Sequence, residues 1–171
     1  MRPAVLLFAL LVSAPLSAAV VPMPPDADEP AEEVKAWVEE AVNLPPYPKT
    51  SSLVEFSVSA ASSNHFLIDA DTLSIGKDGV VRYALVVRSA TGAENVSFEG
   101  IRCATREQKF FAFGQRDGTW ARARNAQWRL IEYKDINRQH AVLHTDIFCA
   151  SGKNPPRAVR EIVQLLRYGP R

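Results

Sequence analysis

The sequence predicts an α+β domain: an antiparallel β-meander of five or more strands, two carboxyl-terminal helices and a short amino-terminal helix. Two observations carry this prediction. Over most of residues 53–130 the apolar side chains alternate with polar ones, as in half-buried strands. Beyond residue 135 the apolar side chains recur at helical spacing instead. A sheet with helices packed on one face is the expected architecture.

The amino terminus has the three-part order of a secretory signal. Arg2 precedes the unbroken apolar run Ala4–Val12, and small residues follow that run. Small side chains at Ser17 and Ala19 favour cleavage after Ala19. An uncleaved anchor is the alternative, but the strongly apolar part is shorter than the roughly 20 residues that a bilayer core requires. We therefore expect a signal peptide over residues 1–19 and export across a membrane.

Charge and size limit the possible classes of protein. The formal net charge is +1, and it becomes 0 when Arg2 is removed with the signal peptide. A neutral chain has no electrostatic footprint for nucleic acid, so no nucleic-acid partner is expected. The remaining length suits one domain, which we place at residues 53–171. Residues 20–52 are predicted to be a flexible lead-in that includes the short helix.

Cys103 and Cys149 are the two cysteines of the chain. An even number of cysteines in an exported protein favours a disulfide between them. A redox-active dithiol is the alternative, but it would require C-x-x-C spacing. In the chain-entropy model, closing a loop of this length stabilises the fold by about 4 kcal/mol.

The short amino-terminal helix is predicted from Pro30, which suits a first helical turn, to the residue before Pro45. Its apolar stripe consists of Val34, Trp37, Val38 and Ala41. We expect this stripe to be core, with a partner-docking face as the alternative.

Strands are predicted from alternation and from the turns between them. They lie at residues 53–59, 66–69, 73–76, 81–88, 96–103 and 109–114, with further strands marked by Trp120 and Trp128. The clearest hairpin turns at Gly76–Gly79, and other turns fall at Ala90–Gly92 and Asp117–Gly118. The apolar phase switches after Phe98, which predicts a bulge at Gly100.

Two helices are predicted in the carboxyl third. Asn137 can cap the first, which would end near Gly152. The second would have Asn154 as its cap and Pro155 at its first position, and Gly169 would end it.

Four segments form a linked pattern. They are Phe66-x-Ile68-Asp69-x-x-Thr72-Leu73-Ser74-Ile75-Gly76-x-Asp78-Gly79-Val80-Val81-Arg82-Tyr83, Glu94-Asn95-Val96-Ser97-Phe98-Glu99-Gly100-Ile101-Arg102-Cys103, Phe111-Ala112-Phe113-Gly114 with Asp117-Gly118-x-Trp120, and Asn137-Arg138-x-His140-x-x-Leu143 leading to Asp146-x-Phe148-Cys149. This pattern resembles the cryptic neisserial protein family over most of residues 53–150. The resemblance implies a bacterial periplasmic protein with no assigned activity. It also implies a lipoprotein, but neither cysteine lies near the cleavage point, so we expect no stable membrane anchor after cleavage.

His140 and His144 lie four residues apart, so on a helix both rings project from one face, as in zinc-binding pairs. No third ligand can be placed beside them. We therefore expect core or surface histidines and no metal site.

Asp69 and Asp71 lie two apart, on one face of an extended strand. Two close carboxylates can shift one pKa upward for acid–base work. The alternative, which we favour, is that both residues shape a turn.

Aromatic and cationic residues are interleaved at Trp120, Arg122, Arg124, Trp128 and Arg129. This mixture suits stacking on a sugar, a peptidoglycan fragment or a partner surface. We place a candidate recognition surface there, with buried strand tryptophans as the alternative.

The leading hypothesis from sequence is a non-enzymatic domain of the cell envelope that binds a partner protein or a small ligand and needs no cofactor. The runner-up is a small hydrolase or metal-dependent enzyme that uses His140, His144, Asp69 or Asp71. A third possibility is a structural accessory that docks through the Trp37 helix.

Overall fold

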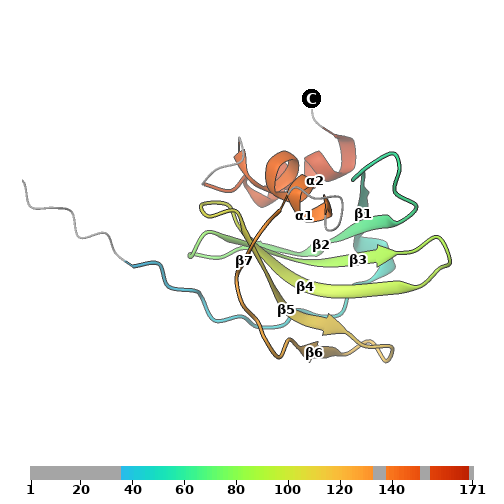
Figure 1. The fold of residues 1–171 in the computed structure, drawn as a ribbon, viewed down its shortest axis with the longest axis horizontal. Coiled ribbons are helices and arrows are strands. Elements are labelled where there is room, and N and C mark those ends of the chain that lie inside the picture. Colours follow the sequence, from blue (N-terminus) through green and yellow to red (C-terminus); the bar gives the residue numbers. More distant parts are fainter. Residues whose placement is uncertain (1–35, 133–137, 151–154, 170–171) are drawn as a thin grey trace, which may run out of the picture. The chain divides into compact units, whose positions relative to one another are not determined.

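The computed structural model describes residues 36–132, 138–150 and 155–169. Within these ranges seven strands form one antiparallel sheet, in which β1 to β6 are neighbours in chain order and β7 pairs with β5 (Figure 1). The predicted meander with carboxyl-terminal helices is confirmed. The strands are β1 (Leu53–Phe56), β2 (His65–Ile75), β3 (Val80–Arg88), β4 (Glu94–Arg102), β5 (Glu107–Gly114), β6 (Trp120–Arg122) and β7 (Arg129–Leu130). The helical elements are η1 (Thr50–Ser52), α1 (Arg138–Val142), η2 (Leu143–Phe148) and α2 (Val159–Tyr168).

The hairpin between β2 and β3 turns where the sequence predicts. The amide of Gly76 donates to the carbonyl of Val80, and Gly79 takes a φ of 75°, a backbone conformation that glycine adopts without strain. β2 itself is one long strand with an irregularity between Asp69 and Ser74, rather than two separate segments.

The predicted bulge at Gly100 is wrong. β4 is continuous, and the extra residue lies on β5, where Phe98 pairs with Ala112 and Glu99 with Phe110. The apolar phase switches in β4 because both faces of the sheet are covered. Gly100 has a packing role, since a Cβ there would stand 2.8 Å from the ring of Phe111.

The carboxyl-terminal helices cover one face of the sheet (Figure 1). The first continues from α1 into η2, a π-helix, and the amide of Cys149 donates to the carbonyl of His144 at its end. The predicted cap at Asn137 lies outside the described residues. The core on this face joins β-strand and helix residues: Phe66, Ile68, Tyr83, Leu85, Ile101, Leu143, Phe148 and Ile162.

The second helix begins later than predicted. α2 starts at Val159 rather than Pro155, because the preceding residues run extended beside the end of η2. Pro156 forms a bridge with Cys149, and the amide of Arg157 donates to the carbonyl of Phe148. Gly169 ends the helix at a φ of 74°, as predicted.

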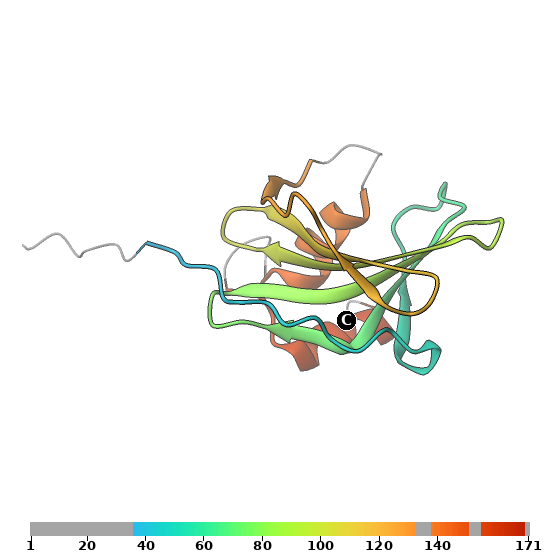
Figure 2. The ribbon, with the colours of Figure 1, turned by 90° about the horizontal axis from the view of Figure 1, so that it is seen from below.

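The predicted amino-terminal helix is not found in residues 36–49, and residues 30–35 lie outside the described ranges. Residues 37–49, which we call the strap, are non-helical and run across the face of the sheet opposite the helices (Figure 2). Along its start the burial alternates, with Trp37 and Glu39 half-buried and Val38 74% exposed. The strap belongs to the same compact unit as the sheet.

Long-range contacts explain why the strap is extended. The indole N–H of Trp37 donates to the carbonyl of Asp78 at 2.8 Å, and the Arg102 guanidinium lies 3.9 Å from the Trp37 ring centroid. Further along, Val42 and Leu44 pack on a second apolar cluster formed by Ala84, Phe98, Phe111 and Ala112. A helix would present only one side of this segment to the sheet at intervals of 3.6 residues.

Candidate functional site

A buried carboxylate on the helix-covered face organises the most polar part of the core. Glu99 of β4 is 1% exposed, and the phenol of Tyr83 donates to its Oε2 at 2.9 Å. The imidazole Nε2 of His140, from α1, lies 2.7 Å from the same oxygen. The hydroxyl of Ser97 donates to Oε1 at 2.5 Å. Buried carboxylates require such partners, since an unpaired buried charge is strongly unfavourable.

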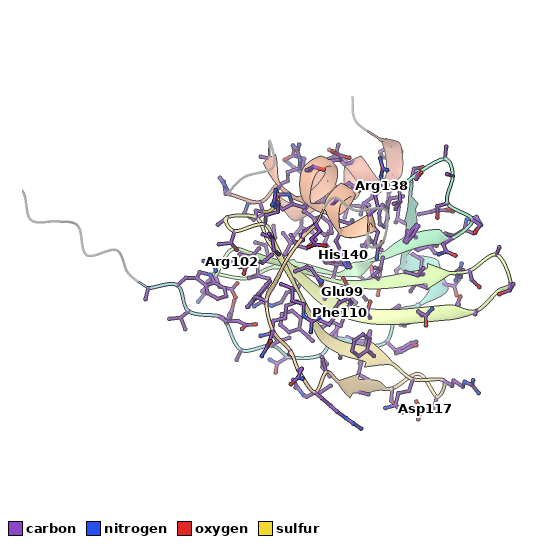
Figure 3. All side chains as sticks on the ribbon, viewed as in Figure 1. Glu99, Arg102, Phe110, Asp117, Arg138 and His140 are labelled. Carbon is purple, nitrogen blue, oxygen red and sulfur yellow. A yellow bond between two sulfur atoms is a disulfide. The ribbon has the colours of Figure 1, made fainter. Side chains whose placement is uncertain are left out.

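The sheet register brings these groups together. Tyr83, Glu99 and Phe110 are directly paired across β3, β4 and β5, so they form one row on the helix-covered face. His140 lies over this row, with its ring 5.8 Å from that of Phe110 in an edge-on arrangement (Figure 3). The network therefore ties α1 to three strands.

A hollow of about 290 Å³ opens beside this network, and we call it the Glu99 hollow. Glu99 and Ser97 contribute to its lining, together with apolar side chains of β3 to β5 and Gln139 of α1. Phe110 and Phe113 stack with ring centroids 5.4 Å apart, and Phe113 is 46% exposed. The hollow thus combines an aromatic wall with a carboxylate.

The surroundings of Tyr83 favour its neutral phenol. Burial, and then the neighbouring charge of Glu99, raise the pKa of Tyr83 well above its ordinary value of 10.0. Tyr83 therefore remains a hydrogen-bond donor at neutral pH. The Nδ1 atom of His140 is buried and has no hydrogen-bond partner among the described residues.

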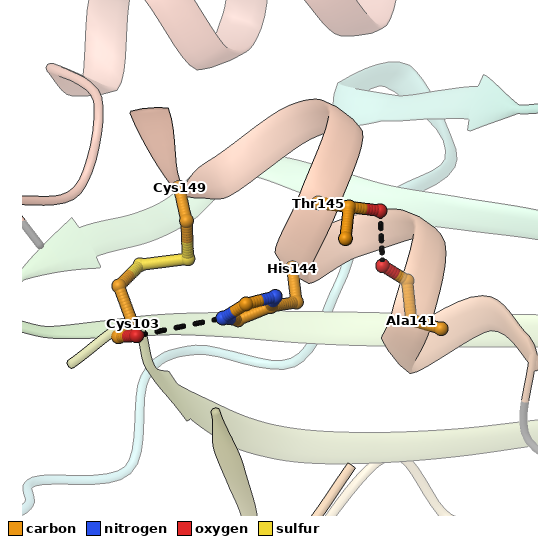
Figure 4. Close-up of a disulfide and its surroundings, with 5 residues drawn as sticks. All are labelled: Cys103, Ala141, His144, Thr145 and Cys149. Atoms are coloured by element: carbon orange, nitrogen blue, oxygen red, sulfur yellow. Dashed lines mark hydrogen bonds between the residues drawn. A yellow bond between two sulfur atoms is a disulfide. The ribbon is translucent and has the colours of Figure 1, made fainter. Parts of the chain in front are cut away.

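His144 lies one turn further along, beside the predicted disulfide. Cys103 and Cys149 are bonded, with Cα atoms 5.6 Å apart. The Nε2 of His144 lies 3.5 Å from the carbonyl oxygen of Cys103, and Thr145 donates to the carbonyl of Ala141 (Figure 4). Burial lowers the pKa of His144 from 6.5, so the neutral ring is favoured.

The two aspartates of the predicted acid–base pair have different surroundings. Asp69 is buried, and its Oδ1 accepts the amide of Asp71, whereas Asp71 itself is exposed. The hydroxyl of Thr72 bonds both the carbonyl of Asp69 and the amide of Ala84. These contacts shape the irregular part of β2 and do not bring Asp69 and Asp71 into the hollow.

In the arginine–aromatic segment, Trp120 is packed against the strap and the arginines face solvent. The indole N–H of Trp120 donates to the carbonyl of Pro45 at 2.9 Å, so this side chain is already bonded to the strap. Arg122, Arg124 and Arg129 are exposed. Contact of these three arginines with a partner stays a prediction.

Asp78 and Arg82 form an ion pair beneath the strap, with Nη2 and Oδ2 2.6 Å apart. Asp78 also accepts the amide of Glu40. Burial alone would raise the pKa of Asp78, but hydrogen bonds from Arg82 and from the amides of Glu40 and Val80 lower it below 3.8. This pair joins the strap to the β2–β3 turn.

Across the described ranges, no cluster of three or more His, Cys, Asp or Glu side chains has an arrangement that could hold a metal ion. Among the same residues, no helix has both the length and the apolar character needed to cross a bilayer.

A model of the CNP1-like family matches residues 32–167. The chain belongs to the CNP1-like family. A curated relative, Cryptic neisserial protein 1 of Neisseria gonorrhoeae (strain ATCC 700825 / FA 1090), is 30% identical over 167 residues, which cover 83% of this chain and 80% of the relative. No solved structure matches the chain. The family assigned by resemblance is therefore confirmed.

Sequence reasoning named His140 as a site candidate but missed Tyr83, Ser97 and the central residue Glu99. Glu99 lies within the region that the family model matches, and it shares a strand face with Ile101 and Cys103, both buried. A charged residue in phase with buried ones signals a buried carboxylate. That signal was open to sequence reasoning once the helix-covered face was assigned to the odd-numbered residues of β4.

Proposed function

We propose that this CNP1-like protein is a non-enzymatic binding domain of the cell envelope that holds a small ligand in the Glu99 hollow. The observation that carries the proposal is the position of Glu99. A carboxylate held by three hydrogen bonds lies in the lining of a hollow that also has an aromatic wall. Small-molecule sites combine an apolar lining with a few well-placed polar groups in this way.

The lining indicates the class of ligand. It includes two carboxylates, Glu94 and Glu99, and no Lys or Arg. Glu94 is paired with Arg88, so its charge is partly offset, and Glu99 is bonded to His140. Stacked Phe110 and Phe113 offer a flat apolar surface. A ligand with an aromatic or aliphatic body and a cationic or hydrogen-donating group complements this lining.

Export supports an envelope role. The sequence predicts a signal peptide over residues 1–19, which lie outside the described ranges, and the disulfide is of a kind that persists in oxidising compartments. We accordingly propose a periplasmic location, with a small ligand or an envelope protein as the partner.

Three one-ring probes test the ligand class: benzylamine, benzyl alcohol and benzoate. By isothermal titration of the protein without its signal peptide, benzylamine should bind most tightly and benzoate least. Phe113→Ser should weaken benzylamine binding about fivefold, because an aromatic contact contributes about 1 kcal/mol.

Leu130→Ser is the matched control, because Leu130 is also an exposed apolar residue, 57% exposed, but lies on β7 outside the lining. It should leave benzylamine binding unchanged. Equal binding of all three probes, or equal effects of the two variants, would contradict the proposal.

The contact of 2.7 Å between His140 and Glu99 favours a second candidate, an enzyme that uses this pair for acid–base chemistry. We rank it lower because both Glu99 oxygens and the His140 Nε2 are engaged in internal hydrogen bonds. Hydrolysis of p-nitrophenyl acetate tests it. If the wild-type protein is faster than a folded His140→Gln variant, the enzyme replaces the binding domain as the leading function.

A further inference from the structure

A second hollow, of about 610 Å³, lies between β1, η2 and α2, and we call it the β1 groove. Its lining includes Glu55, Phe56 and Ser57, three consecutive residues. Because successive side chains of a strand point to opposite faces, consecutive residues line one hollow only where it reaches the edge of the backbone. The β1 groove therefore runs along the edge of the sheet.

β1 is the edge strand on this side. Within the described residues it pairs only with β2, and no further backbone hydrogen bond is made by residues 54–56. In an antiparallel pair, alternate residues direct their N–H and C=O groups away from the partner strand. β1 therefore has backbone groups able to pair with one more strand.

The floor and the rim of the β1 groove have different chemistry. The floor is apolar, with Phe56, Ile147 and Leu166 buried in the main core. The rim carries two exposed carboxylates, Asp146 from η2 and Glu55 from β1, of which Glu55 is bonded to the ring of His65 at 2.7 Å. Its one arginine, Arg157, is already paired with Glu161 at 2.7 Å. The rim therefore favours a basic partner.

We propose that the β1 groove binds an extended peptide as an added strand. The peptide backbone pairs with β1, one apolar side chain enters the groove, and a lysine or arginine lies at the acidic rim. Main-chain hydrogen bonds supply affinity in such complexes, and the pocket for a side chain supplies specificity. This site is separate from the Glu99 hollow, and the two share no lining residue.

The probe is a doubly blocked pentapeptide of lysine, valine, leucine, valine and lysine, carrying a fluorophore. Fluorescence anisotropy with the protein lacking its signal peptide should show saturable binding. The matched peptide with glutamate at both ends should bind at least about tenfold more weakly, since it meets like charges at the rim.

N-methylation tests the strand pairing itself. One probe is methylated at the central leucine nitrogen and another at the nitrogen of the valine before it. Adjacent amides of a strand point in opposite directions, so only one of the two methylated nitrogens should face β1. That probe should bind about tenfold more weakly, because it lacks one buried hydrogen bond. The affinity of the other probe should change little. Equal affinities would overturn strand addition.

Variants of the protein locate the site. Asp146→Asn should weaken binding of the lysine peptide about threefold, because it removes one exposed charge pair. Asp71→Asn, at another exposed aspartate outside the lining, should have no effect. Thr145→Trp should fill the groove and abolish binding, with thermal unfolding as the check of its fold.

Hexylamine serves as the probe for a compact amphiphile at the same place. If hexylamine shifts the backbone amide resonances of residues 55–57 and the lysine peptide does not, the proposal is overturned. It is also overturned if Asp71→Asn and Asp146→Asn weaken binding of the lysine peptide equally.

Discussion

The two faces of the sheet are closed in different ways. The helix-covered face is closed by α1, η2 and α2, and it holds a cluster of buried polar side chains that are bonded to one another, the Glu99 network. The opposite face is closed by the strap, which has no regular secondary structure. Its polar contacts range from half-buried ones, such as the Trp37–Asp78 hydrogen bond, to the buried Asp78–Arg82 pair. Lys109 on that face pairs with Glu39 at 2.7 Å, with both side chains partly exposed.

This difference suggests different roles for the two faces of the sheet. Apolar replacement of a buried ion pair often stabilises a fold equally well or better, so the buried Glu99 network, which adjoins a hollow, is a candidate for function. On the strap face, in contrast, ion pairs and a cation–π contact fix a segment that has no hydrogen-bonded secondary structure of its own. We therefore propose that the helix-covered face binds the ligand and that the strap seals the core on the other face.

Removal of the disulfide should have the largest effect and should fall on the helix-covered face. The double variant Cys103→Ala with Cys149→Ala should lose about 4 kcal/mol of unfolding free energy, from the freedom gained by the unfolded chain. Urea unfolding measures this loss. A loss below about 1 kcal/mol would show that the disulfide does not restrain the unfolded chain as the entropy model requires.

Glu99→Gln should be next in size, at about 3 kcal/mol, because it breaks a buried pair and alters three hydrogen bonds. In a double-mutant cycle with His140→Gln, the two losses should be strongly non-additive. Glu161→Gln is the control, since it breaks an exposed pair with Arg157 and should change stability by less than about 0.5 kcal/mol. Additive losses at Glu99 and His140 would mean that the two side chains act independently.

On the strap face, Trp37→Ala should lose about 2 kcal/mol, because it removes the contacts of the indole with Arg102, Trp128 and the carbonyl of Asp78. Val38→Ala, its exposed neighbour, should change stability by less than about 0.5 kcal/mol. Urea unfolding of both variants provides the comparison. If Val38→Ala is the more damaging of the two, the strap does not lie on the sheet as described.

The smallest effect should be a dependence of stability on pH near His144. Its folded pKa is lowered, so below 6.5 the unfolded state takes up a proton that the folded state does not, and stability falls as the pH falls. The stability of His144→Gln should therefore fall less than that of the wild type between pH 7.5 and pH 5.5. Asp78, whose pKa is also lowered, contributes stability that is lost only at lower pH, near and below 3.8. A variant with the same pH dependence as the wild type would contradict the role of His144.

The sequence was sufficient for features that depend on neighbours along the chain. The turn at Gly76–Gly79 and the end of α2 at Gly169 follow from local backbone preferences, and both were predicted. The disulfide followed from the number of cysteines and the predicted compartment. The family followed from four linked motifs.

Features that depend on distant partners were not accessible in the same way. Trp37 and Val38 fit a helical stripe, but contacts with Arg102 of β4 and with Trp128, just before β7, hold Trp37 in an extended segment. Likewise, Glu99 belongs to a site only because it bonds Tyr83 and His140. The sheet register brings Tyr83 beside it, and α1 brings His140. Local periodicity contains neither relationship.

The most direct test of the account is to map where benzylamine binds by its effect on backbone amide resonances. Binding in the Glu99 hollow should shift residues 95–99 and 110–113 and Gln139, all beside the hollow, and should leave residues 37–49 unshifted. Shifts concentrated on the strap, or no saturable shift at the Glu99 hollow, would contradict the assignment of binding to the helix-covered face.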